Sequence, residues 1–520
     1  MSNNALDSST TLIKTLCELN GYSLIETHIS WVLLSGQYAY KIKKPVNFGF
    51  LDFSTLEQRR HCCHEELRLN QRLAADLYLD VVPITGTVDH PQLGGEGLSL
   101  EYAVKMIQFP ARHLLAEYAK QGQLTTEELD QLTESIAQFH DSIAHADLDS
   151  PYGEGSDINH WFIENFDQIR PLLTDIHQKQ QLQHLQDWDK SESHKLAVFM
   201  QLRKQQGYIR ECHGDLHLGN MTLLNDRVIL FDCIEFNPML RWIDVISEVA
   251  FLFIDLLYFG YKQYAYRFLN RYLQNTGDYK GLTLLPYYLV YRALVRAKVT
   301  LLRQTQQIDD LAASKQLADD YQTYADLAEY FSKPDLAFLM ITHGYSGSGK
   351  SIISSQLSER LGAFQLRSDI ERKKLFGHAP LVQTDSNIDT GIYSAQANIE
   401  TYLHLKELAK VILEAGFPVI VDACFLKSSQ REIFKHLATD CKVPFQIISF
   451  EASEAELSRR IEQRQNDASE ATVKVLYQQI KSAEPLSGQE RNDAIIIDTE
   501  TDNALDLLMK SLNRYTAKKR

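Results

Sequence analysis

The sequence predicts two domains in tandem, an α+β two-lobed domain followed by an α/β doubly wound domain. Its 520 residues are enough for two or three domains. Residues 213–232 combine a His-Gly-Asp motif with an apolar run of strand length that ends at Asp232. Further on, a glycine-rich octapeptide at 344–351 lies between a strand-like run, 337–342, and a helical pattern, 352–361.

The composition describes an ordinary globular protein, with 44% hydrophobic and 23% charged residues. A formal net charge of −15 argues against broad adhesion to nucleic acid or to an anionic membrane. Residues 1–11 are polar, so no signal peptide is expected. Seven cysteines without regular spacing fit a reducing compartment. We therefore expect a cytoplasmic protein.

Two strands are predicted near the start of the chain, Thr27–Leu34 and Tyr38–Lys43, joined by a Ser-Gly-Gln turn. Side chains alternate along a strand, so Ala39, Lys41 and Lys43 share one face. A small residue two places before a lysine is typical of the strand that carries the ATP lysine in kinases. Lys41 is the predicted ATP lysine and Lys43 the fallback. A solvated basic strand is the alternative.

A helix is predicted over Thr55–Ala74. Its apolar stripe contains Glu66, whereas Glu65 belongs to the polar face. A carboxylate on an inward-facing stripe needs a cation. We therefore predict that Glu66 pairs with Lys41, as the strand lysine and helix glutamate do in protein kinases.

The segment His213–Asn220 reads His-Gly-Asp-Leu-His-Leu-Gly-Asn. The spacing of Asp215, Asn220 and Asp232 allows one carboxylate to accept the proton of a substrate hydroxyl while an amide and a second carboxylate hold Mg²⁺. Asp215 is the predicted catalytic base, and Asn220 and Asp232 are the predicted metal ligands. The alternative is a polar loop with incidental carboxylates.

At these residues the chain resembles the aminoglycoside phosphotransferase family, over roughly residues 25–291. The resemblance implies a protein-kinase-like fold, and it implies the same roles for Asp215, Asn220, Asp232 and Lys41. The sequence departs from the protein-kinase pattern because no glycine-rich loop precedes Lys41, and because the metal motif reads Phe-Asp-Cys. The fold also serves phosphorylation of choline, sugars and other alcohols, so the acceptor stays open.

The boundary between the domains is predicted at a break in helical pattern. Leu311–Phe331 is helical, and Ser-Lys-Pro-Asp follows it at 332–335. The predicted domains are therefore 1–333 and 334–520. An apolar stretch at 245–260 carries Glu248 and Asp255 and is shorter than a membrane span, so a buried core helix is predicted there.

The octapeptide Gly-Tyr-Ser-Gly-Ser-Gly-Lys-Ser fits a phosphate-binding loop, in which glycines let the backbone approach an anion at a helix N-terminus. Lys350 is predicted to contact the β- and γ-phosphates, and Ser351 to bind Mg²⁺. A glycine-rich turn with a chance lysine is the alternative. The predicted nucleotide-binding residues of the loop are Gly344, Ser346, Gly347, Ser348, Gly349, Lys350 and Ser351.

Beyond the loop, a short strand at 363–366 leads to Asp369, the predicted base of a second active site, with Arg372 one helical turn later to hold substrate or phosphate. The alternative role for Asp369 is a helix N-cap. A third strand, 417–421, ends at Asp422, which is predicted to bind Mg²⁺ through water or to contact substrate.

Arg460 and Arg464 are spaced one turn apart on a predicted helix, beside the polar stretch 465–470. Two guanidinium groups at such a place suit a lid that closes over ATP phosphates. A solvated charged helix is the alternative. The closing strand of the domain is predicted at 494–498.

Over roughly residues 337–515 the chain resembles the zeta-toxin-like and polynucleotide-kinase-like P-loop kinases. The order of the two domains is similar to that of bacterial bifunctional aminoglycoside phosphotransferase/ATP-binding proteins. We expect an ATP- and Mg²⁺-dependent phosphotransferase with two nucleotide sites and small-molecule hydroxyl acceptors.

Two alternatives to this expectation remain. The second domain could be an ATP-binding switch that transfers no phosphate. It could also phosphorylate nucleic-acid 5′ ends, although the only basic cluster there is short, at Arg367, Arg372, Lys373 and Lys374.

Overall fold

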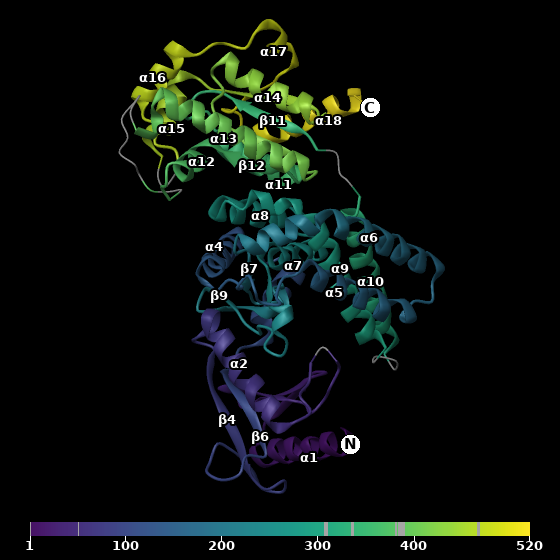
Figure 1. Cartoon of the computed structure of the whole chain (residues 1–520). Helices are drawn as coiled ribbons and strands as arrows, with labels where there is room; N and C mark the ends of the chain where they lie inside the picture. Colours follow the sequence, from purple (N-terminus) through teal and green to yellow (C-terminus); the bar gives the residue numbers. More distant parts are fainter. Residues whose placement is uncertain are drawn as a thin grey trace. The chain divides into compact units, whose positions relative to one another are not determined.

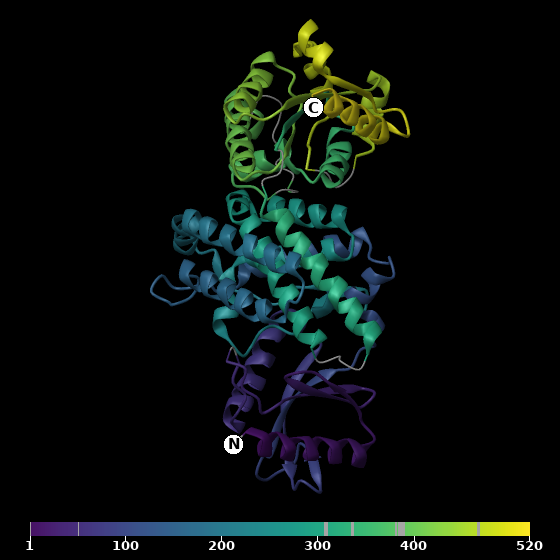
Figure 2. The same ribbon diagram turned by 90° about the vertical axis from the view of Figure 1, so that its right-hand side faces the viewer.

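The computed structural model describes residues 2–49, 51–305, 310–333, 337–379, 382, 391–464 and 468–519. It contains two compact units (Figures 1 and 2). The first unit consists of Met1–Asp255 and Tyr291–Ala325, and the second of Leu256–Val290 and Asp326–Arg520. Among the described residues, no helix is both long enough and apolar enough to span a bilayer.

The first unit begins with a six-stranded sheet of order β1-β2-β3-β6-β4-β5, in which all neighbours are antiparallel. Its strands are β1 (Ser23–Glu26), β2 (Ser30–Leu34), β3 (Tyr38–Lys43), β4 (Tyr78–Gly86), β5 (Pro91–Leu93) and β6 (Glu101–Ile107). The prediction of a strand from Thr27 is wrong by three residues. The Thr27 side chain accepts a hydrogen bond from the Ser30 N–H at 3.0 Å, which makes a turn.

Two helices, α1 (Ser2–Asn20) and α2 (Leu56–Ala74), cover opposite faces of this sheet. The consecutive residues Ala103 and Val104 of β6 pack into the core under α1 and the core under α2, respectively. Lys41 is paired with Val104 across the strands, so its side chain lies on the face covered by α2. The predicted helix at 55–74 is present, and Thr55 caps it. Helix α1 and strand β1 were not predicted.

Helices account for most of the rest of the first unit, and α7, α9 and α10 continue into residues of the second unit. Their bounds are α3 (Leu115–Lys120), α4 (Thr126–Ser142), α5 (Gly155–Ile169), α6 (Ile176–Gln205), α7 (Val245–Tyr258), α9 (Leu285–Gln304) and α10 (Leu311–Phe331). Two short antiparallel pairs carry the motif loops: β7 (Ile209–Glu211) with β10 (Trp242–Asp244), and, between them in sequence, the hairpin of β8 (Met221–Leu224) with β9 (Arg227–Leu230).

The second unit has a five-stranded parallel sheet of order β12-β13-β11-β14-β15. The strands are β11 (Leu339–His343), β12 (Phe364–Arg367), β13 (Val419–Asp422), β14 (Phe445–Glu451) and β15 (Ile495–Asp498). Helices lie on both faces (Figure 2), which confirms the predicted doubly wound α/β fold. The helices wholly within this unit are α8 (Lys262–Thr276), α11 (Lys350–Leu361), α12 (Ser368–Leu375), α13 (Ala395–Glu414), α14 (Ser428–Asp440), α15 (Glu454–Glu462), α16 (Val473–Ser482), α17 (Gly488–Asp493) and α18 (Ala504–Lys519).

The second unit includes Leu256–Val290, which precedes the last part of the first unit in sequence. Helix α8 of this segment packs on α11 and β12. The predicted domain boundary between 333 and 334 adjoins residues 334–336, which lie outside the described part of the chain. It stays a prediction.

Candidate functional site

A cluster of charged side chains lies between β3, α2 and the segment after β9. Lys41 Nζ is 2.8 Å from Glu66 Oε1 and also pairs with Asp232. Lys43 Nζ is 2.7 Å from Glu66 Oε2 and also pairs with Glu235. The predicted Lys41–Glu66 ion pair is therefore present, and Glu66 holds both lysines.

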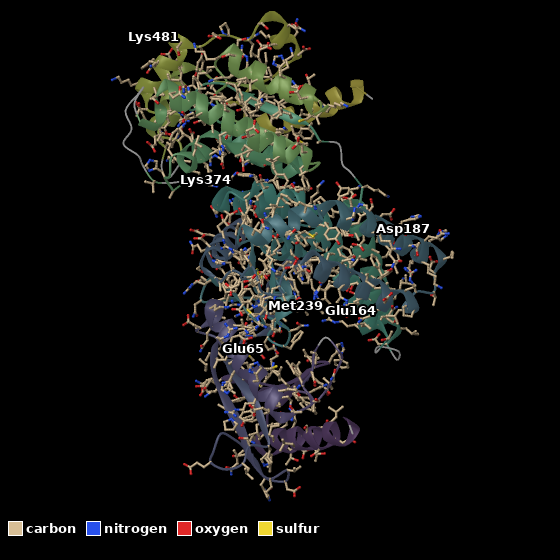
Figure 3. The ribbon with its side chains drawn as sticks, in the orientation of Figure 1. Glu65, Glu164, Asp187, Met239, Lys374 and Lys481 are labelled. Carbon is tan, nitrogen blue, oxygen red and sulfur yellow. The ribbon has the colours of Figure 1, made fainter. Side chains whose placement is uncertain are left out.

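The neighbouring carboxylate, Glu65, is not part of this cluster. It accepts hydrogen bonds from Arg68 at 2.8 and 3.0 Å on the outer face of α2 (Figure 3). The difference between the two glutamates follows from helix geometry, since adjacent residues on a helix point about 100° apart. The assignment of Glu66 to the inward-facing stripe is confirmed.

Exposure separates the two lysines. The Lys43 side chain is 1% exposed and that of Lys41 is 14% exposed. Burial raises the pKa of Glu66, but Lys41 and Lys43 lower it more strongly, to about 2. Asp232 is 39% exposed, so the Lys41 end of the cluster is the one open to a ligand. These contacts favour Lys41 over Lys43 as the group that meets phosphate.

The His-Gly-Asp loop brings two of the predicted residues together. Asn220 Nδ2 donates to Asp215 Oδ2 at 2.9 Å and to the Asp215 carbonyl at 3.0 Å. His217 Nε2 lies 3.3 Å from Asp215 Oδ2. Burial raises the pKa of Asp215, but His217 and Arg296 lower it more, and the pKa is well below its usual value. Asp215 is therefore ionised at neutral pH and can accept a hydroxyl hydrogen bond.

Asp232 is fixed in an unusual backbone conformation just after β9. Its φ of 66° lies in the left-handed region, which is strained for a residue other than glycine. Its N–H donates to the Tyr78 hydroxyl at 3.2 Å, and the preceding Phe231 N–H donates to the Asn220 carbonyl at 3.0 Å. The backbones of the two predicted metal ligands are thus linked through Phe231. A metal ion held by Asn220 and Asp232, next to Asp215 as the base, stays a prediction.

Two buried carboxylates of α7 support this loop, and sequence reasoning gave them no role. Glu248 accepts from the His213 and Gly214 N–H groups at 3.1 and 2.6 Å, and also contacts His140. Asp255 accepts from the Leu218 N–H at 2.8 Å. The two acids are seven residues apart in an apolar helix and so share one face. The seven-residue spacing of two acids in an apolar helix was the signal in the sequence that could have identified them.

In the second unit the glycine-rich loop joins β11 to the N-terminus of α11. Gly344, Gly347 and Gly349 have φ of 145°, 84° and 78°. A Cβ at Gly344 would lie 2.5 Å from the Phe450 carbonyl oxygen, and one at Gly347 would lie 2.7 Å from that of Leu457. Glycine is therefore required at these turns, as a backbone cradle for phosphate needs. This supports the motif against a chance turn.

The polar side chains of the loop make contacts within the second unit. Lys350 Nζ donates to the Tyr345 carbonyl at 2.7 Å and lies 3.3 Å from Ser348 Oγ. Ser346 exchanges two hydrogen bonds with the Gln479 amide of α16, at 2.9 and 3.1 Å. Lys350 thus lies over the loop, where an ammonium group can meet phosphate oxygens.

A second carboxylate lies beside the loop. Asp422 ends β13, the neighbour of β11, and is 3% exposed. Burial raises the pKa of Asp422, and Arg367, Lys350 and the Ser351 hydroxyl act in the opposite direction. Hydroxyl and carboxylate oxygens are ligands that Mg²⁺ uses together with nucleotide phosphates. The side chains of Ser351 and Asp422 therefore fit a Mg²⁺–nucleotide complex.

The structure places Asp369 and Arg372 in α12. Asp369 is the second residue of the helix and is half-buried, and the N-cap position belongs to Arg367. The alternative N-cap role of Asp369 is therefore wrong. Arg372 is 7% exposed and donates to the Ile392 carbonyl at 3.0 Å and to Asn398 at 2.9 Å. Among the described residues, no hydrogen bond or ion pair joins either side chain to the loop.

Arg460 and Arg464 are not equivalent. Arg460 donates to Thr499 at 2.9 Å and lies 3.5 Å from the Gly347 carbonyl, beside the loop. The prediction that Arg464 continues the same helix is wrong, because α15 ends at Glu462. The Arg464 N–H donates to the Ile461 carbonyl at 3.3 Å, which is a hydrogen bond across three residues and makes a tighter turn than an α-helix. The predicted lid includes residues 465–467, which lie outside the described residues.

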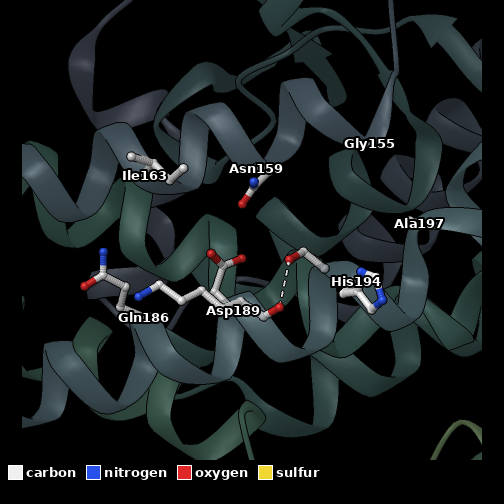
Figure 4. A pocket seen from close by; sticks show the side chains of 9 residues that line it. Gly155, Asn159, Ile163, Gln186, Asp189, His194 and Ala197 are labelled. Carbon is white, nitrogen blue, oxygen red and sulfur yellow. Dashed lines mark hydrogen bonds between the residues drawn. The ribbon is translucent and has the colours of Figure 1, made fainter.

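A cavity of about 380 Å³ between α5 and α6 is lined by polar side chains, among them Asn159, Gln186 and His194, and by apolar groups such as Ile163 (Figure 4). None of the predicted site residues lines it.

Comparison with known proteins gives one family match. Residues 339–486 match the model of the AAA_33 family, described as an AAA domain. This range begins at β11 and includes the glycine-rich loop, α12 and Asp422. The C-terminal region therefore has a nucleotide-binding P-loop kinase-like fold.

Two uncharacterized proteins, Mb2027c of Mycobacterium bovis and Rv2004c of Mycobacterium tuberculosis, are each 28% identical to the chain over 451 residues, which is 86% of this chain and 88% of theirs. A gluconokinase from Sinorhizobium meliloti is similar over 36% of this chain and 99% of its own, with a TM-score of 0.26 and 19% identity. A putative kinase from Chloroflexus aurantiacus is similar over 35% of this chain and 98% of its own, with a TM-score of 0.28 and 18% identity. Because these TM-scores are low, no function is transferred from either structure.

Proposed function

We propose that the chain is an ATP- and Mg²⁺-dependent phosphotransferase with two nucleotide sites, one in each of two domains, 1–333 and 334–520. The observation that carries the proposal is the assembly of the glycine loop, Lys350, Ser351 and Asp422 within a region that matches an AAA domain family. The proposed reaction moves the γ-phosphoryl group from ATP to a hydroxyl group of a small molecule.

For the first site we propose a protein-kinase-like arrangement. Lys41, held by Glu66, meets the ATP phosphates, and Asn220 and Asp232 provide ligands for Mg²⁺. Asp215 accepts a hydrogen bond from the acceptor hydroxyl and takes its proton as the bond to phosphorus forms. The support for this proposal is the Lys41–Glu66 contact at 2.8 Å and the Asn220–Asp215 contact at 2.9 Å. Mg²⁺ would neutralise charge on the phosphates.

For the second site we propose that Lys350 and Arg460 contact nucleotide phosphates, and that Asp369 is the base. Arg460 Nη1 lies 3.5 Å from the position that a Cβ of Gly349 would occupy, so its guanidinium group is close to the loop. Arg372 donates to the Ile392 carbonyl and to Asn398, which supports a positioning role for this arginine. Its contact with substrate or phosphate stays a proposal.

The alternative of a nucleic-acid 5′-end kinase has less support than a small-molecule kinase. Such an enzyme needs exposed cations along a channel. Lys373 is fully buried and pairs with Glu470 at 3.0 Å, and Arg372 is also buried. Two of the four cations in the basic cluster are therefore committed to the protein.

The proposal is tested by incubating the full chain with γ-labelled ATP, Mg²⁺ and a metabolite extract. Label should appear in phosphorylated hydroxyl compounds. A nucleotide switch would bind ATP and leave the extract unlabelled. Asp215→Asn and Asp369→Asn should each remove products of one site, which assigns the products.

A further inference from the structure

Helix α8 binds the edge strand of the second unit mainly through the buried side chain of Asn270, and Gln274 of the same helix also reaches Gln365, at 3.5 Å. Strand β12 is at the end of the sheet, and its Phe364 N–H points inward, to the Pro418 carbonyl at 2.9 Å. The Ala363 carbonyl and the Gln365 N–H therefore point to the free edge. Asn270 of α8 satisfies both groups: its Nδ2 donates to Ala363 O at 3.0 Å, and its Oδ1 accepts from Gln365 N at 2.7 Å. Asn270 therefore makes the hydrogen bonds that a neighbouring β-strand would make at this edge.

The position of α8 is fixed by further contacts in the same unit. Arg267 pairs with Glu359 of α11 at 3.0 Å. The Tyr266 ring lies so close to Gly362 that a Cβ there would be 2.9 Å from it. Lys374, which is labelled in Figure 3, lies at the end of α12 and donates to the Leu273 carbonyl at 3.4 Å. After α8, the Tyr279 hydroxyl donates to Glu371 of α12 at 3.0 Å.

The residue that Asn270 holds, Gln365, reaches the phosphate loop. Its side chain is 2% exposed. Its Nε2 lies 2.8 Å from Ser354 Oγ, 3.2 Å from the Ser351 carbonyl and 3.4 Å from Asp422 Oδ2. One amide nitrogen therefore contacts the two residues that are proposed to serve Mg²⁺, Ser351 and Asp422.

We propose that Gln365 is the positioning residue for the metal side of the P-loop site, and that Asn270 holds Gln365 in place. This inference rests on the proposed use of Mg²⁺–ATP by the second unit. Hydrogen bonds to metal ligands orient them, and their loss commonly weakens metal binding by about 10- to 100-fold. The segment Leu256–Val290, far from the loop in sequence, is then a working part of this site.

The test measures Mg²⁺-dependent binding of a fluorescent, non-hydrolysable ATP analogue to the full chain, in a Lys41→Ala background that removes the first proposed site. Gln365→Met keeps the approximate volume and removes the amide. It should raise the Mg²⁺ concentration for half-maximal binding by about tenfold. Asn270→Ala should raise it by about threefold to tenfold, and binding of the analogue without Mg²⁺ should be unchanged.

A double-mutant cycle distinguishes positioning from general support. If Asn270 acts through Gln365, the double variant should shift the Mg²⁺ dependence no further than Gln365→Met alone. Arg267→Ala is the matched control, because it removes a different α8 contact, with Glu359, and should leave the Mg²⁺ dependence unchanged. Without nucleotide or metal, hydrogen exchange at the Gln365 amide should quicken in Asn270→Ala and not in Arg267→Ala.

The outcomes separate the two proposals. If Mg²⁺-dependent binding in the Lys41→Ala background is absent, or survives Lys350→Ala, the proposed function of the second site fails. If that binding is present but both Gln365→Met and Asn270→Ala leave its Mg²⁺ dependence unchanged, the positioning role is overturned. An equal shift in Arg267→Ala also overturns it. Should Asn270→Ala fail to fold, Gln365→Glu, which keeps the shape and removes the donor, must still shift the Mg²⁺ dependence.

Discussion

Replacing each of the two β3 lysines by methionine should affect different properties: mainly stability for Lys43 and mainly ATP affinity for Lys41. Lys43 Nζ lies between Glu66 and Glu235, and both carboxylates are at most 4% exposed. Removing this lysine leaves Glu235 without its partner in a dry site, which should cost about 3–5 kcal/mol of stability. Burial and Glu66 already act to raise the pKa of Glu235, so protonation of this acid can lower the cost.

Lys41→Met should be milder for the fold. Glu66 keeps Lys43 at 2.7 Å, and Asp232 is 39% exposed and can be hydrated. We therefore expect a loss of about 1–2 kcal/mol. ATP affinity at the first site should fall by about 10- to 100-fold, or about 1.4–2.8 kcal/mol, because an ammonium group is lost from the phosphates.

Both variants are made in a full chain carrying Lys350→Ala, so that calorimetric ATP binding reports the first site alone. Hydrogen exchange of the α2 amides gives the opening free energy of this unit, which a global unfolding curve of a two-unit protein does not. The reasoning is refuted if Lys43→Met abolishes ATP binding without reducing the stability of α2, or if Lys41→Met binds ATP normally.

Four further predictions follow from the two sites. Asp215→Asn should lower turnover at the first site by about 10²–10⁴-fold with little change in ATP affinity, measured by steady-state kinetics; an unchanged rate would remove Asp215 from the reaction. The wild-type chain should bind two ATP equivalents and Lys350→Ala one, by calorimetry, and an unchanged stoichiometry would contradict the second site. Asp369→Asn should lower turnover at the second site and leave its ATP affinity unchanged. Loss of ATP affinity with no separate effect on turnover would favour the alternative of an ATP-binding switch that transfers no phosphate. Burial, Arg431 and Lys350 lower the pKa of His343 from 6.5 to about 4, so the stability it contributes to the second unit is full above pH 6.5 and is lost as pH falls toward 4. This loss of stability is up to about 3 kcal/mol in the wild type and should be absent in His343→Asn, measured by hydrogen exchange of the β11 amides. An equal pH dependence of stability in the two proteins would show that His343 is not its cause.

Local patterns in the sequence were sufficient for the elements that carry the sites. Alternation along 38–43 and helical spacing along 55–74 led to the correct faces for Lys41 and Glu66. The glycine loop and its flanking strand and helix were found because phosphate binding requires that order.

Partners distant in sequence could not be predicted in this way. Glu235 meets Lys43 across 192 residues, and Asn270 meets Gln365 across 95. Neither pair has a local signal, because each depends on how the chain folds back. The prediction that Arg464 lies on the helix was wrong because the spacing of residues along a helix does not indicate where the helix ends.

Transfer of label from γ-labelled ATP to hydroxyl compounds, compared between the wild-type chain and Asp215→Asn, Asp369→Asn and the double variant, tests the central claim most directly. We predict that each single variant loses a different set of labelled products and that the double variant loses all of them. Binding of two ATP equivalents without transfer of label to any acceptor in the wild type would contradict the claim.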